Sequence, residues 1–223
     1  MPKFLGVNKD FFKSWTHEMA YVLGFFTADG CLTINPRGSH YVEFNSNDLD
    51  ILEKIKLVMG SSHKIGCRKR IDSQLPNSYR LQLGSKEIFN DLVKLEFTVN
   101  KSKTVKFPKI SDEYFADYLR GYFDGDGCIS YSNYFRKQRN KHFKYIVVMF
   151  TSGSKEFLIQ LADIIRKEIL IKSPKIIYHS RAYRLSYLSN NAVNILKYIY
   201  NNPVIYLDRK FKKSKLALQF MDR

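Results

Sequence analysis

The sequence has few cysteines and histidines and no long apolar run, so it lacks the patterns of zinc centres, disulfide frameworks and membrane spans. Its three cysteines, Cys31, Cys67 and Cys128, form no CxxC pair and leave one unpaired, which supports neither a zinc site nor a disulfide framework and fits a reducing compartment. The five histidines form no HExxH motif, so a zinc- or histidine-based catalytic centre is disfavoured. No apolar run approaches the roughly 20 residues that span a bilayer, and the first residues lack the apolar core of a secretory signal.

Acidic residues are also scarce relative to basic ones. The 223 residues include 37 Lys and Arg against 21 Asp and Glu, which gives a net charge of +16. This balance indicates a polyanionic partner, with nucleic acid as the leading candidate, although charge that serves only solubility is the simpler alternative. A membrane surface is disfavoured because the basic residues alternate with apolar ones instead of lining one amphipathic helix. With 44% hydrophobic residues, the chain can bury a core as one two-lobed domain or two small ones.

One structural unit occurs twice in the chain. The string VLGFFTADG at 22–30 returns as LRGYFDGDG at 119–127, and YRLQLGS at 79–85 returns as YRLSYLS at 183–189. Between these matches each half has strand-like segments around one helical stretch, over 48–59 and 155–170. The sequence therefore predicts an α+β fold of tandem α-β-β-α-β-β-α repeats, residues 1–107 and 108–223, with Pro108 at the join.

Small residues recur at every fourth position of both motif helices, as Ala20, Gly24 and Ala28 in the first and as Gly121 and Gly125 in the second. This spacing places them on one helix face, so the two helices can approach closely. We expect them to pack at a pseudo-twofold interface between two curved antiparallel sheets, with Ala20, Gly24 and Gly121 in the contact.

The same packing would bring Asp29 and Asp126 side by side at the helix ends. A single Asp-Gly pair would only mark the end of a helix, since Gly is favoured there, but two pairs on paired helices indicate a site. Two carboxylates at the negative ends of helix dipoles repel each other and need a cation. A hard divalent ion such as Mg²⁺ suits oxygen ligands better than zinc does. Between these carboxylates and phosphate groups, it would support phosphodiester hydrolysis.

The two motifs resemble the defining motif of the LAGLIDADG homing endonucleases, in the single-chain form that is a pseudo-symmetric monomer with two motifs. The resemblance covers nearly the whole chain. It implies that Asp29 and Asp126 are catalytic and bind Mg²⁺, with Mn²⁺ able to substitute, and that Ala28 and Gly125 lend backbone carbonyls to the metal. Thr27 stands where Asp is common and where the second motif has Asp124, a position that is mainly structural in the family.

The resemblance also implies a basic residue near each scissile phosphate. Lys101 and Lys210 fit best, because VNKS at 99–102 and DRKF at 208–211 occupy corresponding places. Such a lysine could orient water or stabilise the charge of the transition state, or it could only contact the phosphate backbone. Ser46 and Ser152, which end the second predicted strand of each repeat, stand where the family often has a polar residue that organises water.

One face of the predicted strands is expected to read double-stranded DNA. Alternation places Leu32, Ile34, Val42 and Phe44 inward and the polar residues between them outward. Arg, Asn and Gln on a curved ribbon can pair with base edges in a major groove, while Lys chiefly binds phosphate. A loop at 134–144 with five basic residues and no acid would clamp the DNA backbone or read an outer base. Each candidate could instead be part of a solvated strand face; the set is Thr33, Asn35, Arg37, Tyr41, Glu43, Asn45, Arg68, Arg70, Arg80, Gln82, Ser130, Ser132, Arg136, Lys137, Arg139, Lys141, Arg181, Arg184 and Ser186.

The predicted function is that of an intron- or intein-associated DNA endonuclease that makes a staggered double-strand cut at a long target site. The resemblance implies cuts on opposite strands across the minor groove that leave short 3′ overhangs. Two alternatives are a group I intron RNA maturase and a DNA-binding regulator that does not cut. Both motif acids are present, which favours cleavage, and the lack of a terminal His-Asn favours an intron product. We expect the protein where its host DNA resides, in the cytoplasm (nucleoid) or an organelle matrix, and not secreted.

Overall fold

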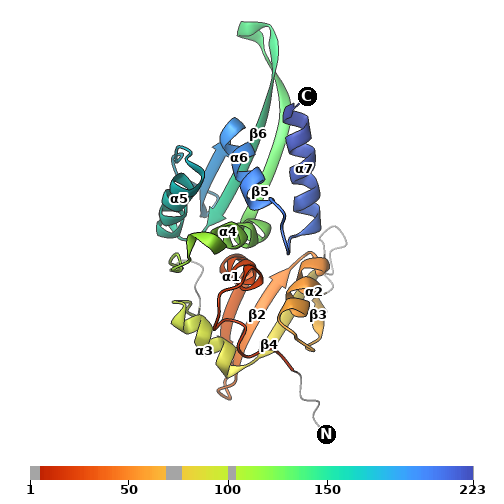
Figure 1. Cartoon of the computed structure of the whole chain (residues 1–223), viewed down its shortest axis with the longest axis vertical. Coiled ribbons are helices and arrows are strands. Elements are labelled where there is room, and N and C mark those ends of the chain that lie inside the picture. The colour runs from red at the N-terminus through yellow and green to blue at the C-terminus, as the bar shows by residue number, and fades with distance from the viewer. Residues whose placement is uncertain (1–5, 69–76, 100–103, 223) are drawn as a thin grey trace.

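The computed structural model describes residues 6–68, 77–99 and 104–222. Its first half runs from α1 to α3 and its second half from α4 to α7 (Figure 1). The first half contains α1 (His17–Asp29), β1 (Gly30–Ile34), β2 (His40–Ser46), α2 (Leu49–Val58), β3 (Ile65–Arg68), β4 (Ser78–Gly84) and α3 (Lys86–Lys94). The second half contains α4 (Asp112–Asp126), β5 (Gly127–Arg136), β6 (Lys141–Ser152), α5 (Lys155–Ile169), β7 (Ile177–His179), β8 (Ala182–Leu188), α6 (Ser189–Ile199) and α7 (Asp208–Asp222).

The two halves repeat one topology. Their four-stranded antiparallel sheets have the orders β1-β2-β4-β3 and β5-β6-β8-β7, and each sheet is preceded by one motif helix. The order α-β-β-α-β-β-α therefore occurs twice, which confirms the predicted fold class. No helix within the described ranges is long and apolar enough to cross a membrane.

Alternation along the strands gives each sheet an apolar face and a polar face. Leu32, Val42 and Phe44 are buried on the apolar face of the first sheet, as predicted. Ile34 was predicted to face inward, but it is 52% exposed. It is the last residue of β1, paired with His40 beside the turn, and so lies beyond the part of the sheet that the core covers.

The motif helices α1 and α4 pack against each other at the centre of the molecule, between the two sheets (Figure 1). A methyl group on Gly24 would overlap the carbonyl oxygen of Tyr118, and one on Gly121 would overlap that of Tyr21. Only glycine at these two positions allows the backbones to come so close. Ala20 is also fully buried in α1. Because α1 faces its own sheet and α4 together, its residues from 19 to 27 are all buried.

The segment at 134–144, which the sequence predicted as a loop, is mostly a β-hairpin. Strands β5 and β6 pair as far as Arg136 and Lys141 and project well beyond the rest of the sheet (Figure 1). Aromatic pairs stabilise this extension, since the ring of Tyr134 lies 5.9 Å from that of Phe143 and 5.8 Å from that of Tyr145. Cross-strand aromatic contacts of this kind favour pairing over an open loop.

Candidate active site at the ends of the motif helices

The two motif acids are the last residues of their helices, and each is followed directly by a strand. Asp29 ends α1 and is partly buried, while Asp126 ends α4 and is exposed. A Cβ atom placed on Gly125 would overlap Cβ of Ala28 and would lie 3.2 Å from Oδ2 of Asp29. The Asp29 carboxylate therefore reaches across the helix interface to the backbone of the opposite motif.

This donor set fits a hard divalent cation better than a transition metal. In the described parts of the chain, no three His, Cys, Asp or Glu side chains converge into a metal site. An ion here would draw on two carboxylates, backbone carbonyls of the Ala28 and Gly125 type, water and substrate phosphate. Mg²⁺ is commonly bound in this way, by one or two carboxylates with several waters and phosphate oxygens.

A polar pocket opens beside Asp29, between the two halves. Its lining comes from both motif helices, the end of β2 and the start of α7: Asp29, Asn45, Ser46, Asn47, Asp48, Ser78, Asp124, Gly125 and Arg209. A second pocket, over β3 and β4, shares Asn45 and Ser78 with the first. The carboxylate of Asp29 is thus continuous with a groove along the polar face of the first sheet.

Ser46 and Ser152 occupy equivalent places at the ends of β2 and β6. The hydroxyl oxygen of Ser46 accepts a hydrogen bond from the backbone N–H of Asp48 at 3.0 Å, and that of Ser152 accepts one from the N–H of Ser154 at 3.1 Å. Each serine thereby fixes the turn from its strand into the next helix. The structure gives them a local structural role, and the predicted role in organising water stays a prediction.

Lys210 closes the C-terminal end of α4. The residue is 5% exposed, and its ammonium group donates hydrogen bonds to the carbonyl oxygens of Phe123, Asp124 and Gly125 at 2.6, 2.8 and 3.1 Å. A cation at this end of a helix is favoured by the dipole. Burial lowers the pKa of Lys210 to about 8, against the opposing effect of Asp124, Asp29 and Asp126. Lys210 therefore holds Gly125 in place beside Asp29, with its three N–H bonds directed at the helix and not at the open pocket. Lys101 lies outside the described residues.

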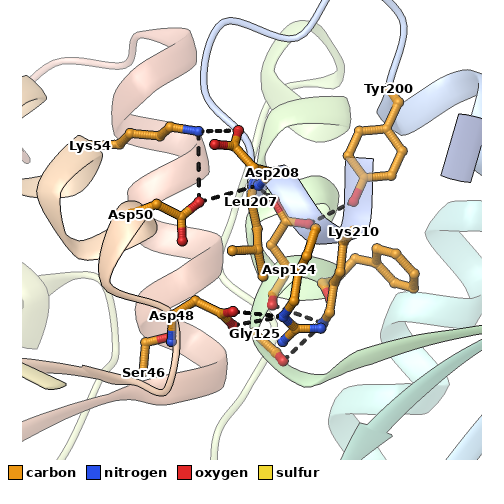
Figure 2. Close-up of polar contacts among 12 residues, drawn as sticks. Ser46, Asp48, Asp50, Lys54, Asp124, Gly125, Tyr200, Leu207, Asp208 and Lys210 are labelled. Atoms are coloured by element: carbon orange, nitrogen blue, oxygen red, sulfur yellow. Dashed lines mark hydrogen bonds and ion pairs between the residues drawn. The ribbon is translucent and has the colours of Figure 1, made fainter. Parts of the chain in front are cut away.

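The side chain of Asp124 is hydrogen-bonded to residues from other parts of the chain, and Figure 2 shows its contacts with Tyr200 and Leu207. The residue is 2% exposed, and its carboxylate accepts hydrogen bonds from Tyr21 Oη at 2.7 Å, Tyr200 Oη at 2.6 Å and the N–H of Leu207 at 2.8 Å. Burial raises the pKa of Asp124, although these donors oppose the shift. The residue joins α1, α6 and the segment before α7 to the motif helix.

Thr27 takes the equivalent place in the first motif with fewer partners. Its hydroxyl donates to the carbonyl of Leu23 at 2.8 Å and accepts from Tyr118 Oη at 3.1 Å. Each motif helix therefore receives a hydrogen bond from a tyrosine of the other: Tyr21 of α1 donates to Asp124, and Tyr118 of α4 donates to Thr27. Both side chains are taken up by hydrogen bonds across the helix interface, which is a structural role.

The start of α7 is tied to α2 of the first half (Figure 2). Lys54 donates to the carboxylate of Asp208 at 2.6 Å and to the carbonyl oxygen of Tyr206 at 2.9 Å. Nε of Arg209 donates to both carboxylate oxygens of Asp48 at 2.8 Å. Sequence reasoning missed these contacts; the only signal was that Arg209 adjoins Lys210, and nothing in the linear pattern relates it to Asp48.

On the first sheet, several residues predicted to read DNA share one polar face around Glu43. Glu43 is only 8% exposed and accepts hydrogen bonds from Gln82 at 2.6 Å and Thr33 at 3.3 Å, while Arg80 lies 3.8 Å from it. It therefore positions its neighbours on this face. Strand register puts Tyr41, Asn45 and Arg68 on the same face.

The turn after β1 carries two further candidates. The side-chain oxygen of Asn35 accepts from the backbone N–H groups of Arg37 and Ser39 at 3.0 and 2.8 Å, so Asn35 shapes the turn and Arg37 is exposed on it. Arg70 lies outside the described residues.

On the second sheet, the register places Ser130, Ser132, Arg184 and Ser186 on the face that carries Met149. Nε of Arg184 is buried without a hydrogen-bond partner. Arg181 is exposed in the turn between β7 and β8. The four hairpin cations predicted to contact DNA are all exposed: Arg136, Lys137, Arg139 and Lys141. The sheet candidates and the hairpin thus form one basic and polar surface.

These features define a class of protein with two α+β repeats and a carboxylate site at the ends of paired, glycine-packed helices. The model of the LAGLIDADG-like domain matches residues 16–94 and again residues 113–200. The chain belongs to the LAGLIDADG family, in its single-chain two-motif form.

Several solved structures of similar fold are protein–DNA complexes. The I-LtrWI LAGLIDADG homing endonuclease bound to target DNA has a TM-score of 0.61 and 14% identity, over 96% of this chain and 92% of that one. The meganuclease I-AabMI bound to uncleaved DNA has a TM-score of 0.60 and 13% identity, over 91% and 89%. I-SmaMI bound to an uncleaved DNA target in the presence of calcium ions has a TM-score of 0.59 and 14% identity, over 94% and 92%. A search of curated protein sequences found no match.

Proposed function

We propose that this chain is a site-specific homing DNA endonuclease. It would hydrolyse two phosphodiester bonds in a metal-dependent reaction and leave a staggered double-strand break at a long target site. The observation that carries the proposal is the carboxylate of Asp29, which meets the backbone of Gly125 across the helix interface, beside a groove that runs onto a polar sheet face.

Charge and shape support DNA as the partner. The net charge of +16 and the cations of the projecting hairpin favour a polyanion, and the polar faces offer Arg, Asn and Gln side chains to base edges. The solved structures with this fold include several DNA complexes. We infer that the protein acts as an intron-encoded monomer on DNA of its own compartment, in the nucleoid or an organelle matrix.

Each element of the site has a separate task in the proposed reaction. Asp29 and Asp126, with the carbonyls of Ala28 and Gly125, would hold Mg²⁺ or Mn²⁺. A bound divalent ion supplies Lewis acidity toward phosphate oxygen and lowers the pKa of water. Lys210 fixes the end of α4, Asp124 fixes the start of α7 against it, and the polar sheet faces hold the DNA so that a phosphate enters the pocket. Positioning of this kind accounts for much of the rate in phosphodiester chemistry.

Incubation with a library of randomised duplexes, followed by sequencing of the cut ends, tests the proposal. We expect cleavage at one long consensus in Mg²⁺ and no cleavage in EDTA. Tight binding of a duplex consensus without cutting in Mg²⁺ or Mn²⁺ would instead indicate a DNA-binding regulator. A lack of any duplex preference, together with binding to folded group I intron RNA, would indicate a maturase.

A further inference from the structure

The pocket beside Asp29 is lined by a cation, Arg209, that adjoins Lys210 in the sequence. Lys210 directs its N–H bonds at three carbonyls of α4 and is buried. Arg209 comes from the same turn of α7, but it lines the pocket together with Asp29 and Gly125, and its side chain is 60% exposed. It is the better placed of the two for a ligand that enters the pocket.

The Arg209 guanidinium is held along one edge. Its Nε donates to both oxygens of Asp48 at 2.8 Å. A guanidinium has five N–H donors in a fixed plane, and the hydrogen bonds it makes with other described residues use only Nε. A carboxylate at one edge restricts the rotation of the plane, and the remaining donors match the two oxygens of a phosphate.

We propose that Arg209 binds the phosphate that is cleaved at the Asp29 site and that Asp48 positions it. This inference rests on the proposed endonuclease function and adds a residue that the motif comparison does not supply. The guanidinium would contact two non-bridging phosphate oxygens and would offset the negative charge that develops on them in the transition state. Arg209 makes and breaks no covalent bond, and its proton stays in place, since the group is always charged.

The two repeats differ at this position, which makes the proposal specific to one DNA strand. In the second repeat, Ser154 occupies the place of Asp48, two residues after the strand-ending serine, and its hydroxyl accepts from the N–H of Phe157 at 3.2 Å to cap α5. In the sequence alignment of DRKF with VNKS, Arg209 corresponds to the uncharged Asn100. Neither the acid nor the arginine is repeated, so a loss of Arg209 should slow the cut in only one strand.

The test uses two substrates that carry the consensus selected above: a supercoiled plasmid, which reports nicking, and a linear duplex labelled at the end of one strand or the other, which reports the strand that is cut. It compares the full-length wild-type protein with three variants. Arg209→Ala removes the cation, Asp48→Asn removes only its anionic partner, and Arg166→Ala removes an exposed cation of a surface pair on α5 as the matched control. We expect Arg209→Ala to accumulate nicked circles, with one strand cut about 100-fold more slowly and the other at the wild-type rate. Asp48→Asn should slow the same strand by much less, and Arg166→Ala should cut as wild type does.

Several results would overturn the proposal. If Arg209→Ala and Asp48→Asn slow both strands to the same extent, the pair is only a structural tie between the repeats; if Arg209→Ala linearises the plasmid at the wild-type rate, the residue does not contact the reacting phosphate. If a thermal melt shows that Arg209→Ala is unfolded, Arg209→Lys takes its place, because lysine keeps the charge and the ion pair but loses the planar fork. The proposal then requires that the Arg209→Lys protein cut one strand more slowly than the other. A wild-type protein that cuts no DNA would instead refute the endonuclease function itself.

Discussion

At the scale of single residues, Asp124 and Lys210 hold the end of the second motif helix in place. At the end of α4, the carboxylate of Asp124 accepts three hydrogen bonds and the ammonium of Lys210 donates three. Both act on the backbone that presents Gly125 to Asp29. The placement of the two motif acids therefore depends on these neighbouring side chains.

Replacing Asp124 with Leu should destabilise the protein. The change leaves the hydroxyls of Tyr21 and Tyr200 and the N–H of Leu207 without their acceptor in a buried place, and each such donor costs about 1–3 kcal/mol. We expect the free energy of unfolding in urea to fall by roughly 3 kcal/mol. Asp124→Asn keeps one acceptor oxygen and removes a charge that burial disfavours, so its loss should be smaller. Equal stability of Asp124→Leu and wild type would contradict the claim that these three hydrogen bonds stabilise the fold.

Lys210 should make stability depend on pH in the alkaline range. Because burial lowers its pKa from 10.5 to about 8, the unfolded chain binds more protons than the folded chain between these values, and the free energy of unfolding rises with pH there. Relative to Lys210→Met, which cannot titrate, wild type should gain up to about 3 kcal/mol between pH 8 and pH 10.5. Urea titrations of both proteins at several pH values measure the difference. A difference that is constant or falls with pH would show that the folded-state pKa is not lowered.

The positions of Asp29 and Asp126 at the helix ends and the structural nature of position 27 were predictable at this scale, because the two repeats could be aligned residue by residue. The partners of Lys210 were not, since its contacts join segments more than 80 residues apart. Sequence alternation also placed Glu43 on the polar face correctly but could not show that Thr33 and Gln82 cover it. The burial of a residue on a polar face depends on whether long side chains lie next to it, and the strand register decides which residues are its neighbours.

At the scale of secondary-structure elements, the close packing of α1 against α4 sets the distance between the two acids. Gly24→Ala should disturb this packing, because the new methyl group would overlap the carbonyl oxygen of Tyr118. We expect a loss of about 1–3 kcal/mol in the free energy of unfolding, even though alanine favours a helix more than glycine does.

Gly66→Ala is the matched control for this substitution. The nearest atom to its new methyl group would be the carbonyl oxygen of Arg80 at 3.8 Å, which is an ordinary contact, so its stability in the same urea titration should stay close to that of wild type. Equal losses in Gly24→Ala and Gly66→Ala would mean that the helix interface is not tightly packed.

Most elements follow from hydrophobic periodicity and the repeat. The predicted helices 48–59 and 155–170 correspond to α2 and α5 with shifts of one residue at their ends. The hairpin at 134–144 was missed because basic residues dominate it and its pairing depends on stacked aromatic rings. Ile34 was wrongly placed because alternation gives the face of a residue but not the extent of the core beneath it.

At the scale of the whole molecule, two similar halves form an asymmetric protein. The second half has the longer hairpin, and the start of α7 returns to contact α2 of the first half through Lys54 and Arg209. Duplication in the sequence predicted the shared fold. It could not predict these differences, because contacts between the halves have no counterpart within a single repeat.

The projecting hairpin should contribute to DNA affinity through charge. Replacing four of its five basic residues, Arg136, Lys137, Arg139 and Lys141, with Ala removes up to four phosphate contacts. Each lost contact reduces the magnitude of the slope of log K against log salt by about 0.9. We therefore expect the slope of duplex binding, measured by fluorescence anisotropy between low and moderate salt, to become shallower by roughly 3. Replacing Arg166 and Lys167 on α5 should leave it unchanged. If the substitutions in the hairpin leave the salt dependence of binding unchanged, the DNA does not contact these cations.

The central claim is that Asp29 and Asp126 act together as a metal-dependent cleavage site and not merely as helix ends. The most direct measurement compares wild type with Asp29→Asn and Asp126→Asn on the selected target, using affinity in Ca²⁺ and cleavage rate in Mg²⁺. We predict that both variants bind the target nearly as tightly as wild type and yet produce no linear DNA. Double-strand cleavage at the wild-type rate by either variant would contradict the account.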